Sequence, residues 1–384
     1  MKWGTWGAAL AAAWLAAGVR GADEIRIGAL FAVTGPAAAL GAPEARTAEM
    51  LAEKLNAEGG VLGRKVRLIV KDTAGNPEKA VSFCKQLIEE ERVLAILGPS
   101  TSGETLQIKK LCNDEKTLLL SCAAAETIVN PVARYVFKTP QKDSQAATHI
   151  FRSMAGRGIA RVGVLVDNSG FGQAGKAQIE ALAPTNGIAI AACETYDKAA
   201  TDLTDILAKV KAQNVQAVIN WSIVPAQAIV ARNMRQIGMD VPLYQSHGFG
   251  SLKYVQQAGE AGEGILFPCG RILVAEQLPD DHPQKATLMA YKQAYESRCK
   301  EEAGSFGGYA HDAFALVIAA IKAANSTETD KVRDALENLK GFAGVSGVYS
   351  FSPTDHTGLG LDSLEMLTVR KGAFAIAPAA AKQP

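Results

Sequence analysis

The stretch GFGQAGKA at residues 170–177 lacks one group that a nucleotide-binding loop needs. In the phosphate-binding loop G-x-x-x-x-G-K-[ST], backbone amides and the lysine hold phosphate, and the last hydroxyl holds Mg²⁺. The glycines and Lys176 fit this pattern, but Ala177 has no oxygen for a metal ion. Because an apolar run precedes the stretch, we interpret it as a tight strand-to-helix turn with Phe171 at its tip. Such turns lie at the carboxyl ends of parallel strands, where ligands bind.

A second segment, GPSTSGETL at residues 98–106, joins a predicted strand to a predicted helix and presents the hydroxyls of Thr101 and Ser102. Free amides at a helix start, together with hydroxyls, bind anions such as carboxylates. Serine and threonine at this place also act as plain helix caps, which is the commoner role.

Two more segments follow predicted strands and would face the same edge of a sheet. Residues 119–128 carry small side chains, so their main-chain groups could face a ligand. Residues 245–251 contain His247 and Gly248, and Trp221 ends another strand. A structural histidine and a core tryptophan are the alternative interpretations of these two side chains.

The sequence patterns of common hydrolases and metal enzymes are missing. There is no G-x-S-x-G elbow, no H-E-x-x-H or H-x-x-E-H pair among the five histidines, and no C-x-x-C. We therefore expect no catalytic residue, no metal ion and no cofactor.

The N-terminus predicts export. A basic start, an apolar run at residues 8–17 and small residues up to Gly21 are typical of a secretory signal peptide, which we assign to residues 1–21. That run is too short to span a bilayer, which takes about 20 apolar residues. We expect a soluble, monomeric periplasmic protein. With 40 basic and 39 acidic residues and no basic stripe, nucleic acid is not an expected partner.

Six cysteines in an exported chain could pair in fifteen ways. We expect a mixture of buried thiols and one or two disulfides among Cys84, Cys112, Cys122, Cys193, Cys269 and Cys299.

Apolar strands and amphipathic helices alternate along the chain in two series. The strands are predicted at residues 25–32, 66–71, 93–98 and 117–123, and then at 161–167, 188–193, 215–222 and 243–245. Near-continuous apolar strands separated by helices are typical of a parallel sheet covered on both faces. The sequence therefore predicts an α/β protein with two doubly wound parallel-sheet lobes and an additional C-terminal portion.

Several segments occur in an order that resembles one known family. They are IGALFAVTGPAAALG from Ile27, LNAEGGVLGRKVRLIVKDTAGNPEKAV from Leu55, ILGPSTSGET from Ile96, DNSGFGQAG from Asp167, TDLTDILAKVKAQNVQAVI from Thr201 and YAHDAFALVIAAIKAA from Tyr309. Each is weak alone. In this order the chain resembles the leucine/isoleucine/valine-binding family of ABC-transporter substrate-binding proteins from about Glu24 to near its C-terminus.

The resemblance implies a type I periplasmic binding fold, in which three crossover strands form a hinge between two lobes. Lobe 1 would comprise residues 24–140 and 273–349, and lobe 2 residues 141–272 and 350–384. The lobes would close around one small molecule and dock on an inner-membrane ABC permease. A free-standing ligand-sensing receptor domain of the same fold is the alternative class.

The resemblance also implies ligand contacts. The family's serine that holds a ligand carboxylate falls on Ser102, and its backbone carbonyl contact falls on Ala123. A threonine that helps to hold the α-ammonium falls on Ala125, and the acid that pairs with this ammonium falls on His247. Two positions that are often aromatic in the family fall on Phe171 and Leu40, so the leucine departs from the family. Phe306 and Tyr309 should lie near the cleft.

The departures at Ala125 and His247 suggest which ligand is bound. A buried ammonium without acceptors is very costly. Ser102 keeps the carboxylate half of the site, whereas Ala125 and His247 change the ammonium half. We therefore expect a carboxylate without an α-amino group, favouring an aromatic acid between Phe171, Trp221 and Tyr309. A neutral or branched-chain amino acid, held with the help of Glu126, remains the alternative.

Overall fold

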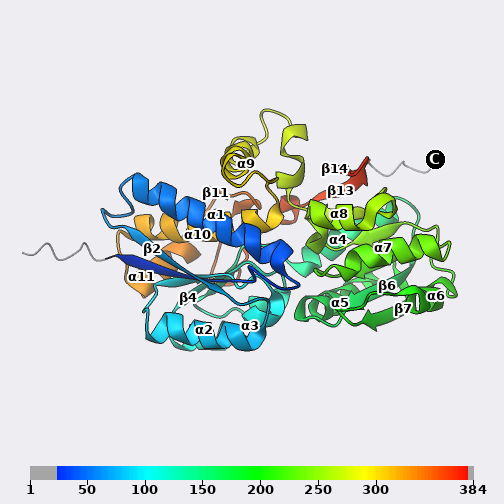
Figure 1. Ribbon diagram of the computed structural model, residues 1–384, viewed down its shortest axis with the longest axis horizontal. Coiled ribbons are helices and arrows are strands. Elements are labelled where there is room, and N and C mark those ends of the chain that lie inside the picture. The colour runs from blue at the N-terminus through cyan, green and yellow to red at the C-terminus, as the bar shows by residue number, and fades with distance from the viewer. Residues whose placement is uncertain (1–23, 379–384) are drawn as a thin grey trace, which may run out of the picture.

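The computed structural model describes residues 24–378, so the predicted signal peptide and the last six residues lie outside the described part of the chain. Two α/β lobes stand side by side (Figure 1). Among residues 24–378, no helix is both long and apolar enough to cross a bilayer.

The first lobe is built on a parallel sheet with the strand order β2-β1-β3-β4-β5. Its strands are β1 (Ile25–Phe31), β2 (Val66–Asp72), β3 (Ala95–Leu97), β4 (Leu118–Ser121) and β5 (Val136–Lys138). Its helices are α1 (Ala38–Ala57), α2 (Pro77–Glu89), α3 (Ser102–Asp114), α9 (Lys285–Cys299), α10 (Ser305–Ala324) and α11 (Thr329–Glu337). Helices α1 and α10 cover one face of this sheet, and α2 and α3 cover the other (Figure 1).

Helix starts in this lobe follow the local sequence. The side chain of Asn76 caps α2 by accepting hydrogen bonds from the amides of Glu78 and Lys79, and Pro77 occupies the first helical position.

The second lobe has the sheet order β14-β13-β10-β9-β8-β6-β7. Its strands are β6 (Arg161–Asp167), β7 (Ala189–Tyr196), β8 (Ala217–Trp221), β9 (Leu243–Gln245), β10 (Leu266–Cys269), β13 (Glu365–Arg370) and β14 (Ala373–Ile376). Its helices are α4 (Asp143–Ala155), α5 (Gly170–Leu182), α6 (Thr204–Lys211), α7 (Ala226–Gln236) and α8 (Leu252–Ala258). Strands β6 to β10 are parallel, whereas β13 and β14 add an antiparallel edge that the predicted parallel sheet did not include.

The chain passes between the two sheets three times: after β5, after β10 and after the short hairpin of β11 (Phe342–Ala343) and β12 (Val348–Tyr349). Gln141 in the first crossing ties two of them together, because its Nε2 donates to the carbonyl oxygens of Ser346 at 2.7 Å and Ser363 at 3.3 Å. We keep the two residue sets given above as the proposed lobes.

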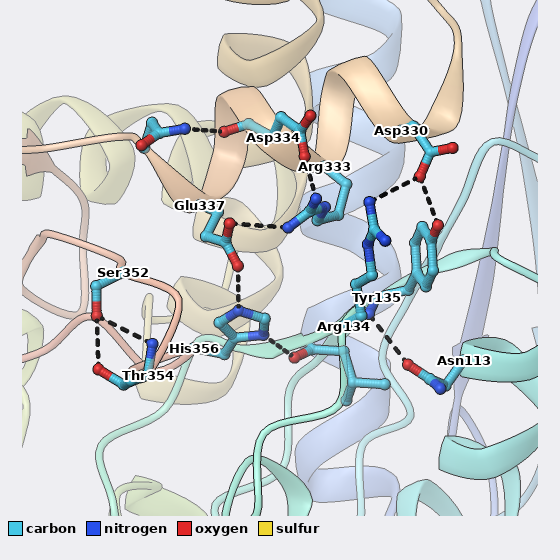
Figure 2. Close-up of polar contacts among 12 residues, drawn as sticks. Asn113, Arg134, Tyr135, Asp330, Arg333, Asp334, Glu337, Ser352, Thr354 and His356 are labelled. Atoms are coloured by element: carbon cyan, nitrogen blue, oxygen red, sulfur yellow. Dashed lines mark hydrogen bonds and ion pairs between the residues drawn. The ribbon is translucent and has the colours of Figure 1, made fainter.

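The third crossing is anchored on the first lobe by His356, as Figure 2 shows. One imidazole nitrogen lies 2.8 Å from the carbonyl oxygen of Val136 in β5, and the other lies 3.2 Å from a carboxylate oxygen of Glu337 in α11. Arg333 in turn donates to the second carboxylate oxygen of Glu337 at 2.8 Å. The hinge is therefore a hydrogen-bonded structure rather than a loose linker.

The expectation of one or two disulfides was wrong for this structure. All six cysteines fall within the described residues, and all are free thiols. Cys84 in α2 and Cys112 in α3 face each other with their sulfurs 3.5 Å apart, whereas a disulfide bond measures about 2.0 Å.

Candidate ligand-binding site

A narrow cavity of about 20 Å³ lies between the lobes at the carboxyl ends of their parallel strands. The first lobe contributes side chains from α1, from the loops after β3 and β4, and from α10. The second contributes α5 and the loops after β8 and β9. The lining residues are Leu40, Ser100, Ser102, Ala123, Ala124, Phe171, Ile223, His247, Gly248, Phe306 and Tyr309.

A larger groove of about 340 Å³ adjoins this cavity and shares Phe306 with it. Its charged side chains include Lys253, Lys292, Glu301 and Glu302. We place the ligand site in the smaller cavity, because buried polar atoms without hydrogen-bond partners gather there, including the Tyr309 hydroxyl and both imidazole nitrogens of His247. Buried polar atoms normally have partners, so a ligand is the natural way to satisfy these.

The start of α3 delivers a hydroxyl to the cavity. Thr101 caps the helix by accepting from the amide of Glu104, which leaves Ser102 as its first residue. The Ser102 oxygen accepts from the Ala125 amide at 3.2 Å, so its own O–H is available to donate to a ligand carboxylate. Ser100 is already engaged, because it donates to Glu44 and accepts from the Ala32 amide at 3.0 Å.

The glycine-rich stretch forms the first turns of a helix, which corrects the predicted turn. Helix α5 begins at Gly170, the first residue of the stretch, with the hydroxyl of Ser169 accepting from the Gly172 amide. The glycines permit close packing: a Cβ on Gly172 would lie 2.1 Å from the Asp167 carbonyl oxygen, and one on Gly175 would lie 2.1 Å from Nε1 of Trp221. Tertiary contacts therefore account for the glycines.

Three aromatic rings pack together at the second lobe's side of the cavity. His247 lies edge-on to Phe171 and to Trp221, with ring centroids 5.4 and 5.6 Å apart. Ser246 fixes the turn that presents His247, since its hydroxyl accepts from the Gly248 amide and donates to the Ser222 carbonyl oxygen. Burial, together with the nearby charge of Lys138, lowers the pKa of His247 to about 3, so the imidazole is neutral at physiological pH.

A buried charged cluster lies directly behind His247. The Nε2 atom of His247 is 3.8 Å from Oδ1 of Asp143, the first residue of α4. Burial raises the pKa of Asp143 to about 7, although Lys138 opposes this shift. Burial likewise lowers the pKa of Lys138 to about 7, against the attraction of Asp143. The Lys138 ammonium donates to the carbonyl oxygens of Ala124 and Gln141.

The structure brings together most of the predicted site residues. Those that line the cavity are Leu40, Ser102, Ala123, Phe171, His247, Gly248 and Tyr309. Thr101, Ala125 and Trp221 do not line it. Thr101 caps α3, and Ala124 lines the cavity in place of the buried Ala125. The fully buried Trp221 packs behind Phe171 and His247.

Sequence reasoning missed Ile223 and the cluster of Lys138 and Asp143. The available signal was the segment VFKTPQKD at residues 136–143, in which Lys138 ends an apolar strand and Asp143 begins the next helix five residues later. Within residues 24–378, no group of His, Cys, Asp and Glu side chains could hold a metal ion.

Two α/β lobes that enclose a small, partly polar cavity at their strand ends define a protein that binds a small molecule. The chain belongs to the periplasmic binding protein family, which matches residues 24–372. Among relatives, the leucine-, isoleucine-, valine-, threonine- and alanine-binding protein of Pseudomonas aeruginosa is 27% identical over 336 residues, 86% of each chain.

Solved structures show the same architecture. An extracellular ligand-binding receptor from Rhodopseudomonas palustris HaA2 has a TM-score of 0.87 and 26% identity, covering 92% of this chain and 100% of its own. The branched-chain amino acid transporter substrate-binding protein LivJ of Streptococcus pneumoniae, in complex with isoleucine, has a TM-score of 0.80 and 25% identity, covering 92% and 99%.

Proposed function

We propose that this protein captures a neutral amino acid with an apolar side chain, with branched-chain amino acids as the favoured ligands. It would then deliver the ligand unchanged to an ABC permease of the inner membrane. The observation that carries the proposal is the composition of the cavity. The Ser102 hydroxyl at a helix start suits a carboxylate, and Leu40, Phe171, Ile223 and Phe306 suit an aliphatic side chain.

Two observations weigh against the aromatic acid that we expected from the sequence. The indole of Trp221 is fully buried and does not line the cavity, so one of the three expected aromatic walls is not available. The buried carboxylate of Asp143 behind His247 also supplies a charge that an ammonium could use. The names of the Pseudomonas and Streptococcus relatives favour the same ligand class.

A calorimetric titration of the purified protein with leucine, isoleucine, valine, leucinol, benzoate and 4-hydroxybenzoate tests this proposal. We expect the three amino acids to bind and leucinol to fail, because leucinol lacks the carboxylate that Ser102 would hold. In thermal unfolding, a ligand at 100 times its Kd should add about 2.7 kcal/mol of stability. Binding of the benzoates without any response to the amino acids would overturn the proposed ligand class.

A further inference from the structure

The lining of the cavity contains no carboxylate, although an amino-acid ligand would bring an ammonium group into it. The polar side chains in the lining are those of Ser100, Ser102, His247 and Tyr309. An ammonium in a buried place needs acceptors, since an unpaired charge away from water is very costly. A neutral imidazole has one nitrogen that accepts and one that donates.

Two lining side chains have polar atoms that are free to serve, the Tyr309 hydroxyl and the imidazole of His247. Neither of its ring nitrogens has a hydrogen-bond partner in the structure. Its Nε2 faces Oδ1 of Asp143 across 3.8 Å, so Nδ1 is the nitrogen left for the cavity. A small rotation of the ring or the carboxylate would close this gap to a hydrogen bond.

Asp143 is equally incomplete. Both carboxylate oxygens are buried, and neither accepts a hydrogen bond of normal geometry, although the Glu126 amide is close enough to lower the pKa of this carboxyl group. A buried acceptor without a donor is costly. The His247 Nε2 atom is the side-chain nitrogen nearest to this carboxyl group, at 3.8 Å, while the Lys138 ammonium donates to two carbonyl oxygens.

We propose that Asp143 and His247 act as a relay that recognises the ligand's ammonium group. His247 donates Nε2–H to Asp143 and accepts a hydrogen bond from the ammonium at Nδ1. Asp143 is thus a positioning residue that fixes the tautomer and lends negative charge without touching the ligand. This inference rests on the proposed amino-acid ligand.

A second buried acid, Glu44, also lies behind the cavity, but it does not recognise the ammonium group. The Ser100 hydroxyl between Glu44 and the cavity already donates to that carboxylate and accepts from the Ala32 amide. Burial also raises the pKa of Glu44 well above its usual range, which disfavours its charged form. It therefore offers little charge to a ligand.

The relay makes binding depend on pH. Lys138 from β5, Glu126 from the turn after β4 and His247 surround Asp143, and the ion pair of Lys142 and Asp355 also lies near Lys138. The pKa of Asp143 is raised to about 7, so at pH 6 the carboxyl group is mostly protonated. A bound ammonium group favours the ionised form of Asp143, so ligand binding at pH 6 should release the proton from this carboxyl group. Affinity should rise as the pH passes through about 7 and then level off.

The first test is proton release from the unmodified protein. Leucine is titrated at pH 6 in two buffers of different ionisation enthalpy, which gives the number of protons released per ligand. We expect release that approaches about one proton, and none above pH 8, because the relay is then already ionised. A measured release of zero at pH 6, with leucine binding intact, would overturn the relay.

Variants separate the relay from a structural role. Asp143→Asn should weaken leucine binding by about 10- to 100-fold and abolish proton release, whereas 4-methylpentanoate, which is leucine without its amino group, should be affected by less than about threefold. Glu44→Gln, at the buried acid that Ser100 separates from the cavity, is the matched control and should leave both values unchanged. His247→Glu combined with Asp143→Asn places an acid directly in the lining and should restore leucine affinity.

The outcomes separate the two proposals. Leucine binding that Asp143→Asn leaves unchanged, or proton release that persists in that variant and so comes from Lys138, contradicts the relay alone. Failure of the unmodified protein to bind any of the amino acids contradicts the proposed function itself.

Discussion

Replacing Gly170 with alanine is expected to weaken ligand binding by about 5- to 150-fold, whereas the same change at Gly103 should have little effect. The two glycines face each other across the cleft from the first turns of α5 and α3. A Cβ on Gly170 would lie 2.9 Å from the Gly103 Cα atom and 3.0 Å from its nitrogen. These are backbone atoms, so the lobes themselves would have to separate.

The expected size follows from the cost of overpacking. Extra methyl groups in tight contacts cost about 1–3 kcal/mol, and this cost falls only on the closed arrangement of the lobes. A ligand that needs the closed state loses affinity by the same free energy. Stability without ligand should not fall, because replacing glycine with alanine also reduces the freedom of the unfolded chain.

Gly103→Ala is the matched control, since a Cβ there would have nothing closer than the Gly170 nitrogen at 4.0 Å. Titration calorimetry with leucine, or with whichever ligand the panel identifies, measures both variants. Equal affinities for the two variants would show that the contact between α3 and α5 does not belong to the ligand-bound state.

The alternation of elements was predictable, because each central strand is a short apolar run between two amphipathic segments. Strands β1, β2, β6 and β8 lie where the sequence placed them. Strands β5, β10 and β14, each three or four residues long, were not predicted. Strand β13, which pairs with β10 and β14, lies about a hundred residues after β10, so only the folded chain brings this edge together.

The start of α5 shows why local signals can mislead. Glycine usually marks a turn, and the sequence GFGQAG was interpreted in that way. Here, Gly172 and Gly175 are helical, and what they share is a neighbour that leaves no room for a Cβ. A single sequence does not show such neighbours, because Trp221 is 46 positions away along the chain.

The site was predictable where it follows from topology. Loops after adjacent parallel strands converge, so Ser102 and Ala123 could be grouped from the sequence, whereas His247 in the other lobe was joined to them by the family resemblance. The direction of individual side chains was not predictable: Trp221 lies behind the lining, and a one-residue difference exchanges Ala125 for Ala124. Asp143 was missed because an acid at a helix start is usually an exposed partner of the helix dipole, whereas this one is fully buried.

Gly175→Ala is expected to destabilise the protein by about 1–3 kcal/mol, the usual cost of forcing an extra methyl group into a packed core. The new Cβ would lie 2.1 to 2.5 Å from three atoms of the Trp221 indole. This ring is fully buried and is held by Phe171 on one side and His247 on another, so it has no free direction in which to move. Because those two neighbours line the cavity, ligand affinity should fall together with stability.

A double-mutant cycle identifies Trp221 as the source of this cost. Trp221→Phe alone should be destabilising, because a smaller ring leaves a void. In the double variant the alanine methyl group fills part of that void, so the combined loss should be clearly smaller than the sum of the two single losses. Urea unfolding followed by far-ultraviolet circular dichroism gives the three free energies of unfolding. Strict additivity would mean that the indole is not what excludes a side chain at position 175, and the tight packing of α5 against β8 would need another explanation.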